Sequence, residues 1–455
     1  MNPQRPAIQV VGGGLAGCEA ALQLARFGLS VVLHEMRPAT ASPAHRSGDL
    51  AELVCSNSLK SEDPATASGL LKQELDLLGC RLLALARQHA VPAGTALAVD
   101  RERFAEHVTE LVASDPRITV ERGELTKLSA ERDQSAGYWL LATGPLTSPP
   151  LQQTIGRLAG AEGLFFSDAI APSVTRESLD LDILYRASRY DKGSADYLNA
   201  PLDESTYRRF TSELVAAEKA QLHRVDRREL FAGCQPIEAI AASGPDSLAF
   251  GPLRPVGLID PRSGERPYAV LQLRQENRDG SIYGLVGFQT QLKHGEQRRI
   301  FRMIPGLAAA EFVRLGQLHR NFYLDSPRLL DHRFALRSAP WIRLAGQMTG
   351  VEGYVESIAS GLVTAWLLAA EIHQIQLPPW PATGIIGALL FDFLSDTTSR
   401  HFTPMNANFG LLPPLLHKVR GKREGKLAKA ERGRLDTERF LAAPSVRRLL
   451  AAVPS

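Results

Sequence analysis

The chain has 455 residues, of which 44% are hydrophobic and 22% charged, and its formal net charge is +3. This length is enough for two or three domains with a full hydrophobic core. The near-balance of charge excludes a polycation, so a nucleic-acid partner would have to meet a local basic patch.

Several classes of protein are disfavoured by what the sequence lacks. The first residues contain no apolar stretch before a small-residue cleavage site, and the longest apolar candidate, residues 362–370, is too short to span a membrane. The four cysteines, Cys18, Cys55, Cys80 and Cys234, are too few for a disulfide framework and have neither Cys-x-x-Cys nor zinc-like spacing. We therefore expect a soluble cytoplasmic protein with reduced thiols and no metal site.

The first 35 residues have the order of a dinucleotide-binding unit. An apolar run at 7–11 leads into a Gly-x-Gly-x-x-Gly turn, residues 18–27 have helical spacing, and a second strand at 30–33 leads to an acid. The glycines permit a tight turn and close approach of a pyrophosphate to the helix N-terminus, and the acid accepts hydrogen bonds from ribose hydroxyls. The residues expected to bind the cofactor here are Gly12, Gly13, Gly14, Gly17 and Glu35.

Two later segments favour FAD over NAD as the tightly held dinucleotide. Residues 138–145 are an apolar strand that ends in Ala-Thr-Gly, and residues 342–347 are a second strand followed by a helix at about 356–370. Many flavoproteins return near the end of the chain in this way to hold the flavin portion, although Gln347 stands here in place of the usual acid. No second glycine fingerprint follows a strand, so we expect NADH or NADPH to bind transiently. The expected contacts are Gly144, Gly346, Gln347, Gly350 and Tyr354.

The middle of the chain is rich in charged and aromatic residues. It contains a predicted amphipathic helix at 214–222 and strand-like runs at 269–273 and 282–288. We predict an α/β protein: a Rossmann-type, glutathione-reductase-like FAD-binding domain formed by 1–150 and 330–455, with a smaller α+β domain inserted at 151–329. Residues 418–434 carry eight Lys/Arg against two Glu, which is typical either of a solvated helix or of an arm that contacts phosphates.

The cysteines divide by their surroundings. Cys18 and Cys80 adjoin apolar helical stretches, where a thiol is usually a small buried hydrophobe. Cys55 and Cys234 have polar, Gly and Pro neighbours that suit loops. From the residues alone, Cys55 is a buried small residue, half of a redox pair or a nucleophile. Candidates for contacts with an anion or a thiolate, each equally a surface charge, are Lys60, Lys192 and Arg254.

Segments along nearly the whole chain resemble one family, the folate- and FAD-dependent tRNA uracil-5-methyltransferases (TrmFO). The resemblance is most specific around Cys55, Cys234 and Met405. The matching stretches are 10–35, 52–62, 98–101, 166–172, 188–193, 233–238, 250–258, 346–361 and 404–410.

This resemblance implies a reaction and its participants. NADH or NADPH reduces FAD, and the one-carbon unit of 5,10-methylenetetrahydrofolate is passed to C5 of a uridine, forming 5-methyluridine at position 54 in the T loop of tRNA. Such chemistry needs a thiolate that adds to C6 of uracil and a base that removes the C5 proton. The two cysteines described for the family map onto Cys55 and Cys234. We favour Cys234 as the nucleophile and Cys55 as its partner near the flavin.

The implied substrate predicts an RNA surface. The uridine lies inside the tRNA elbow, so it must be turned out, and phosphate contacts must supply much of the affinity. No membrane and no stable protein partner are expected. Three alternatives remain: the same chemistry on ribosomal RNA, an NAD(P)H-dependent flavin oxidoreductase acting on a small substrate, and an FAD-bearing RNA-binding protein without turnover. Besides 418–434, the basic residues expected to meet RNA are Arg208, Arg209, Arg224, Arg227 and Arg228.

Overall fold

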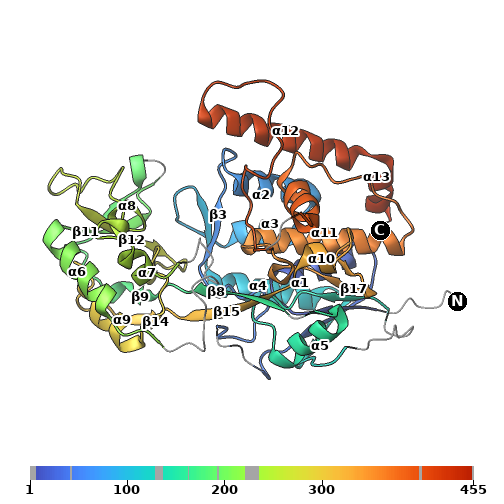
Figure 1. The fold of residues 1–455 in the computed structure, drawn as a ribbon, viewed down its shortest axis with the longest axis horizontal. Coiled ribbons are helices and arrows are strands. Elements are labelled where there is room, and N and C mark those ends of the chain that lie inside the picture. Colours follow the sequence, from blue (N-terminus) through green and yellow to red (C-terminus); the bar gives the residue numbers. More distant parts are fainter. Residues whose placement is uncertain are drawn as a thin grey trace.

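The structure, a computed structural model, has two lobes (Figure 1). The larger lobe is built from both ends of the chain and the smaller lobe from its middle. The structure describes residues 7–40, 42, 44–128, 137–161, 163–191, 194–220, 235–398 and 402–452. Cys234, Lys192, Arg224, Arg227 and Arg228 lie outside the described residues.

A six-stranded sheet forms the centre of the larger lobe. Its strand order is β16-β17-β7-β1-β2-β6, and all neighbours are parallel except β16 and β17. Val10 of β1 lies between Leu33 of β2 and Leu140 of β7, so the carboxyl ends of these strands meet at one edge. The strands are β1 (Ile8–Val11), β2 (Val31–Glu35), β6 (Ile118–Arg122), β7 (Trp139–Leu141), β16 (Ala335–Leu336) and β17 (Ala339–Leu344).

Helices cover this sheet, and a small sheet extends it toward the smaller lobe (Figure 1). The helices are α1 (Leu15–Arg26), α2 (Ala67–Leu78), α3 (Arg81–Gln88), α4 (Arg101–Ser114), α5 (Pro149–Ala159), α10 (Ser326–Leu329), α11 (Tyr354–Ile372), α12 (Lys422–Ala442) and α13 (Pro444–Ala451). The small sheet has the order β3-β5-β4, with β3 (Ser58–Ser61), β4 (Ala90–Val91) and β5 (Ala96–Val99).

Helix α11 corrects the expectation that no segment approaches membrane-spanning length. It has 19 residues and is apolar enough to cross a membrane by length and composition. However, 83% of its apolar window is buried, and it packs along α1 so closely that a Cβ on Gly361 would lie 2.1 Å from the carbonyl oxygen of Ala16. Its hydrophobicity is that of a helix surrounded by its own protein.

The smaller lobe is an antiparallel sheet with helices. Its strand order is β10-β11-β12-β13-β9-β14. The strands are β9 (Ser173–Thr175), β10 (Tyr185–Ala187), β11 (Tyr197–Leu202), β12 (Ala269–Gln275), β13 (Ile282–Leu285) and β14 (Phe312–Arg314), and the helices are α6 (Glu204–Ala216), α7 (Ile237–Ala242), α8 (Ser247–Phe250) and α9 (His294–Phe301). Two paired antiparallel strands, β8 (Leu164–Ala169) and β15 (Leu318–Tyr323), carry the chain into and out of this lobe.

The predicted fold class is confirmed, and one predicted helix is wrong. The helix expected at 214–222 is α6, which begins much earlier because Asp203 caps it, accepting a hydrogen bond from the backbone N–H of Thr206 at 2.7 Å. The chain after α6 is extended, and Lys219 forms a β-bridge with Leu292. The start of α6 is therefore set by the cap residue Asp203, which is not part of the apolar pattern.

The two lobes have separate hydrophobic cores. One cluster takes residues from Ile8 to Ile155 and again from Phe322 onward, whereas the other takes residues from Val174 to Ala310. The predicted domain boundaries at 150 and 330 remain a prediction that this division supports. Helix α5 packs with the first core, which favours a boundary after residue 160.

Candidate active site

A pocket lies at the sheet edge where β1, β2, β7 and β17 end. It takes its walls from the glycine turn after β1, the acid at the end of β2 and the segments after β7 and β17. Seven of the predicted cofactor residues line it, whereas Gly13, Gly17 and Gly350 do not. The seven are Gly12, Gly14, Glu35, Gly144, Gly346, Gln347 and Tyr354.

The glycine turn leaves room at the start of α1. A Cβ on Gly17 would lie 1.9 Å from the carbonyl oxygen of Gly12, so only glycine allows the helix to start this close to the strand. A Cβ on Gly14 would meet no atom within 4 Å. The free N–H groups of the first helical turn therefore face open space in the pocket, which fits a pyrophosphate.

Glu35 is held as an ionised acceptor. One carboxylate oxygen accepts the backbone N–H of Gly13 at 2.8 Å, and the other accepts the backbone N–H and Nε of Arg37 at 2.9 and 2.8 Å. Burial raises the pKa of Glu35, but the hydrogen bonds from Arg37 and Gly13 outweigh it and lower the pKa below the usual value. The sequence predicted Glu35 but gave no sign of Arg37.

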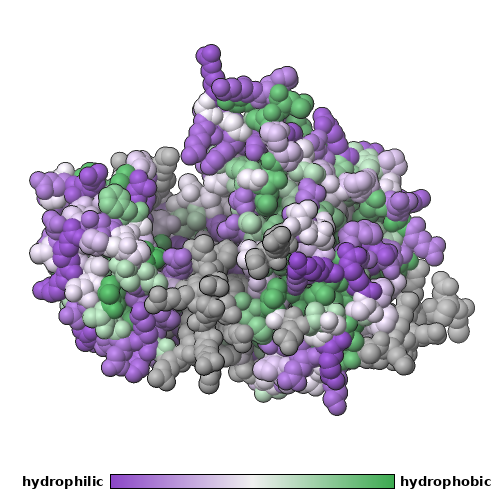
Figure 2. Space-filling view, in the orientation of Figure 1, coloured by the Kyte–Doolittle hydropathy of each residue, from purple (hydrophilic) through white to green (hydrophobic). Residues whose placement is uncertain are grey.

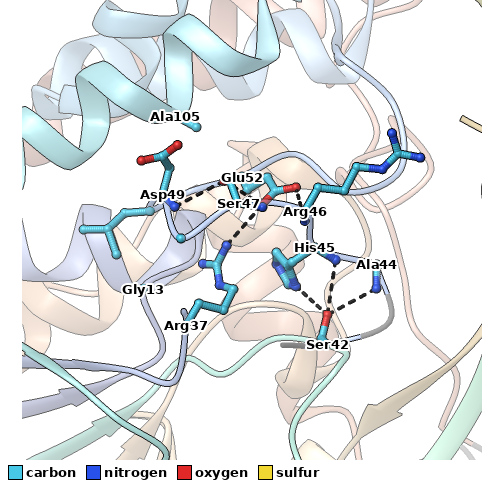
Figure 3. A network of polar contacts seen from close by, with 12 residues as sticks. Gly13, Arg37, Ser42, Ala44, His45, Arg46, Ser47, Asp49, Glu52 and Ala105 are labelled. Atoms are coloured by element: carbon cyan, nitrogen blue, oxygen red, sulfur yellow. Dashed lines mark hydrogen bonds and ion pairs between the residues drawn. The ribbon is translucent and has the colours of Figure 1, made fainter. Parts of the chain in front are cut away.

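A second acid, Glu52, joins this corner to the cysteine segment (Figure 3). Its carboxylate accepts hydrogen bonds from Arg37 Nη1 at 3.3 Å, from the backbone N–H of Arg46 at 2.9 Å and from the backbone N–H and hydroxyl of Ser47, both at 3.0 Å. Because Glu52 precedes Cys55 by only three residues, the loop that carries the thiol is anchored to the arginine that orients Glu35.

The wall formed by the returning chain is also fixed by hydrogen bonds. Gln347, predicted as a cofactor contact, donates from Nε2 to Glu352 at 2.5 Å. The backbone N–H of Gly346 donates to the hydroxyl of Ser360 at 3.0 Å, and Gly144 has open space where a Cβ would stand. Gly350 supports the segment that follows Phe402, since its carbonyl accepts the backbone N–H of Met405 at 2.9 Å.

Cys55 lies next to this pocket. Its backbone N–H and that of Ser56 donate to the phenolic oxygen of Tyr354, at 2.7 and 3.2 Å, and Tyr354 itself lines the pocket. Burial, with Cys55 nearby, raises the pKa of the Tyr354 phenol, which stays neutral. Cys55 is partly exposed, whereas Cys18 and Cys80 are buried and burial raises the pKa of both thiols. Cys234 lies outside the described residues.

Two arginines of the smaller lobe hold the residues on either side of Cys55. Arg314, at the end of β14, donates from Nη1 to the carbonyl oxygen of Val54 at 2.9 Å. Arg274, on β12, donates from Nε to the side-chain oxygen of Asn57 at 2.9 Å. The Cys55 segment therefore lies at the junction of the lobes, held on either side by a cationic side chain of the smaller lobe. Sequence reasoning missed both arginines because they lie more than 200 residues from Cys55.

An ion pair between a half-exposed lysine and a buried glutamate stands beside this segment. Lys60 Nζ lies 2.6 Å from Glu356 Oε1, and Glu356 is fully buried while Lys60 is 38% exposed. The same carboxylate oxygen accepts the backbone N–H of Ala407 at 3.0 Å. The structure thus joins Lys60, the first turn of α11 and the predicted 404–410 motif. Arg254, another predicted contact, is exposed on the smaller lobe.

The fold and pocket define a Rossmann-type, FAD-binding protein with an inserted domain. A family model described as glucose inhibited division protein A matches residues 7–376. A solved structure of GidA from Aquifex aeolicus superposes with a TM-score of 0.69 over 99% of this chain and 76% of that chain, at 16% identity. That likeness concerns the fold alone.

Curated relatives specify the family. A methylenetetrahydrofolate–tRNA-(uracil-5-)-methyltransferase TrmFO of Heliobacterium modesticaldum is 51% identical over 96% of this chain and 98% of its own length. A TrmFO of Rhodospirillum rubrum is 50% identical over 97% of this chain and 94% of its own length. The chain therefore belongs to the TrmFO family within the wider glucose inhibited division protein A group, and the predicted family is confirmed.

Proposed function

We propose that this chain is a methylenetetrahydrofolate- and FAD-dependent methyltransferase that forms 5-methyluridine in tRNA, with NADH or NADPH as the reductant. The observation that carries the proposal is the hydrogen bond from the Cys55 backbone to Tyr354, which holds a thiol at the rim of a dinucleotide pocket. Relatives at about 50% identity bear the name of this activity. The two enzymatic alternatives, ribosomal RNA as the substrate and oxidation of a small molecule, have no such support.

The pocket residues would hold FAD by the contacts that their chemistry offers. The first turn of α1 would bind the pyrophosphate, and Glu35 would accept hydrogen bonds from ribose hydroxyls. Gly144, Gly346, Gln347 and Tyr354 would border the flavin portion. When bound, FAD supplies the electrons that turn the transferred one-carbon unit into a methyl group.

The thiols would act on the uracil. In our proposal a thiolate of Cys234 would add to C6 of uracil, and C5 of the resulting enolate would attack the methylene carbon of the folate. A base would then remove the C5 proton as tetrahydrofolate leaves the new methylene group, and the Cys234 thiolate would leave C6 as that group is reduced to methyl. Cys55 would serve as the partner of Cys234, in a base or protective role. The guanidinium groups of Arg274 and Arg314 flank the Cys55 segment and would stabilise negative charge there.

The target that we propose is the uridine at position 54 in the T loop. It must leave the folded elbow to reach a thiol at the junction of the lobes. We place the enzyme in the cytoplasm with its tRNA, without a membrane or a stable protein partner.

The direct test uses purified protein, an unmodified tRNA transcript, labelled methylenetetrahydrofolate and NADH or NADPH, with mass spectrometry of the nucleosides. We expect labelled 5-methyluridine, and none when cytidine replaces uridine at position 54. Absence of product from a folded, FAD-bearing protein would overturn the proposal, and product only on a ribosomal RNA fragment would replace tRNA as the substrate.

A second test addresses the thiols. Cys234→Ala should abolish product while the FAD absorbance persists, and Cys55→Ala should lower product strongly. Cys80→Ala is the matched control, because Cys80 is buried in the link between α2 and α3, and it should retain most of the activity. An active Cys234→Ala variant would show that another group attacks C6.

A further inference from the structure

A groove lined by basic side chains lies between α12 and the chain before it, with the Glu424 carboxylate beside Gly421 at its edge. Its walls carry His417, Lys418, Lys422, Lys426 and Lys429, and no acidic side chain lines it. Figure 2 shows hydrophilic side chains around a small apolar patch on this projecting part of the larger lobe. Because the whole chain has a net charge of only +3, this is a local concentration of charge.

The lysines of the groove differ from the other basic residues of α12. Lys422, Lys426 and Lys429 recur at the spacing that puts side chains on one face of a helix. Among the described residues, no carboxylate forms an ion pair with Lys418, Lys422 or Lys426, whereas the arginines of α12 are engaged. Arg423 pairs with Asp63 at 2.7 Å, Arg434 with Glu431 at 2.8 Å and Arg439 with Asp436 at 2.6 Å.

Several contacts hold the groove as a fixed surface. A Cβ on Gly433 would lie 2.8 Å from the carbonyl oxygen of Thr383, and the Thr383 hydroxyl donates to Asp436 at 2.7 Å. On the other wall, Lys429 Nζ donates to the carbonyl oxygen of Phe409 at 3.1 Å. The lysines are therefore presented by a packed helix and not by a loose tail.

The chain that forms one wall of the groove is bonded to the turn of α11 beside the candidate active site. The chain just before Phe409 passes the first turn of α11, where the backbone N–H of Ala407 donates to Glu356 and that of Glu352 donates to the carbonyl of Met405. Tyr354 lies two residues before Glu356 in the same helical turn, and its hydroxyl accepts the backbone N–H of Cys55. In Figure 1 the N-terminal end of α12 is the end nearer the smaller lobe.

We propose that this groove binds the sugar-phosphate backbone of the tRNA arm next to the target uridine. The inference rests on the proposed function and adds the surface that receives the substrate. Lysines one helical turn apart, about 5.4 Å, suit neighbouring phosphates on one strand. The exposed Leu416 and Val419 would also suit an anionic lipid surface. The spacing of the lysines along one helix face and the chain connection from Phe409 to the Glu356 turn beside Cys55 favour RNA, so lipid binding is an outcome of the test.

The test compares two variants of the full FAD-bearing protein. Lys422→Glu/Lys426→Glu reverses the sign of two charges in the groove. Arg447→Glu/Arg448→Glu makes the same change of charge on the exposed face of α13. The dissociation constant for an unmodified tRNA transcript is measured between about 50 and 200 mM KCl. We expect the groove variant to bind at least about tenfold more weakly with a salt slope lower by about two, and the α13 variant to bind within about twofold of the unaltered protein.

Further measurements keep the outcomes distinct. The FAD absorbance and thermal midpoint show whether the groove variant is folded, and Lys422→Arg/Lys426→Arg should restore binding. Hydroxyl-radical footprinting should show protection of the T arm that the groove variant loses. If the groove variant binds tRNA with unchanged affinity while the unaltered protein makes 5-methyluridine, the proposal that the groove binds tRNA is wrong. The proposed methyltransferase function then still stands. Loss of binding to phosphatidylglycerol vesicles without loss of tRNA binding also overturns the groove proposal. Absence of methylation by the unaltered protein would instead overturn the proposed function.

Discussion

The phenolic oxygen of Tyr354 accepts the backbone N–H of Cys55 at 2.7 Å, across 299 residues of sequence. Tyr354 belongs to the first turn of α11 and lines the dinucleotide pocket. One side chain thus joins the cofactor wall to the segment that carries the thiol. The position of the thiol and the integrity of the pocket are therefore coupled.

Removing the Tyr354 hydroxyl should disturb the position of the Cys55 thiol but should not reduce the binding of FAD. Tyr354→Phe keeps the ring but removes the acceptor of the N–H groups of Cys55 and Ser56. Losing such an acceptor costs about 1–3 kcal/mol of free energy. We expect 5-methyluridine formation to fall by about tenfold to a hundredfold while the FAD content is retained. Tyr138→Phe, which removes a hydroxyl bonded to Glu371, is the matched control and should stay near full activity. Equal activity in both variants would show that the hydrogen bond does not position the thiol.

The parts of the fold that follow local patterns could be predicted from sequence. The strand, glycine turn, helix and acid of the first 35 residues lie next to one another in the chain, and the structure places them as β1, α1 and β2. The start of α6 was missed because it depends on Asp203, a cap outside the apolar pattern. The bounds of α1 and α11 also differ by one to three residues from the predicted ones.

The site was predictable only where a motif carried it. Gly12, Gly14 and Glu35 were found because the spacing of a fingerprint is local. Arg274 and Arg314 reach the Cys55 segment through contacts between the lobes, and no periodicity or spacing in the sequence records such a contact. The role of Arg37 was hidden for another reason, since a lone arginine after a strand resembles any surface charge.

The Lys60–Glu356 pair should be worth more than an exposed pair of the same length. Lys60→Met would leave the fully buried Glu356 without its cation, and we expect a loss of about 3 kcal/mol. The control is Lys293→Met, because Lys293 lies at the same 2.6 Å from Glu218 but both side chains are more than half exposed. The Lys293→Met substitution should lower the free energy of unfolding by less than about 1 kcal/mol. Thermal midpoints measure both, and Lys60→Met/Glu356→Gln should recover part of the loss.

Glu35 should control the retention of FAD. Glu35→Gln removes the charge that pairs with the buried Arg37 and one of the acceptors in the pocket. We expect the affinity for FAD to fall by about tenfold or more, since one hydrogen bond to a charged group contributes about 1.5–3 kcal/mol. The ratio of flavin to protein absorbance after purification measures this loss. Glu110→Gln on the exposed face of α4 should keep the full FAD content.

Glu74 should make stability depend on pH. It is buried in α2, and its carboxylate accepts the backbone N–H groups of Ile385 and Ile386 at 2.7 and 2.8 Å. Burial raises the pKa of Glu74 to about 7, and these hydrogen bonds only partly oppose the rise. The unfolded chain titrates near the ordinary carboxyl value of about 4.3. Between these two values the folded protein binds more protons than the unfolded chain, so the free energy of unfolding falls as the pH rises.

The loss should begin above about pH 4.3, level off above about pH 7 and amount to at most about 4 kcal/mol. Thermal midpoints at pH 5 and pH 8 measure it. Other groups titrate over the same window, so the informative quantity is the difference from Glu74→Gln, which cannot ionise and should show a flatter profile. Glu110→Gln should keep the profile of the unaltered protein, because Glu110 is exposed. Parallel profiles for the unaltered protein and Glu74→Gln would mean that Glu74 stays ionised in the folded state, held by the backbone N–H groups of Ile385 and Ile386.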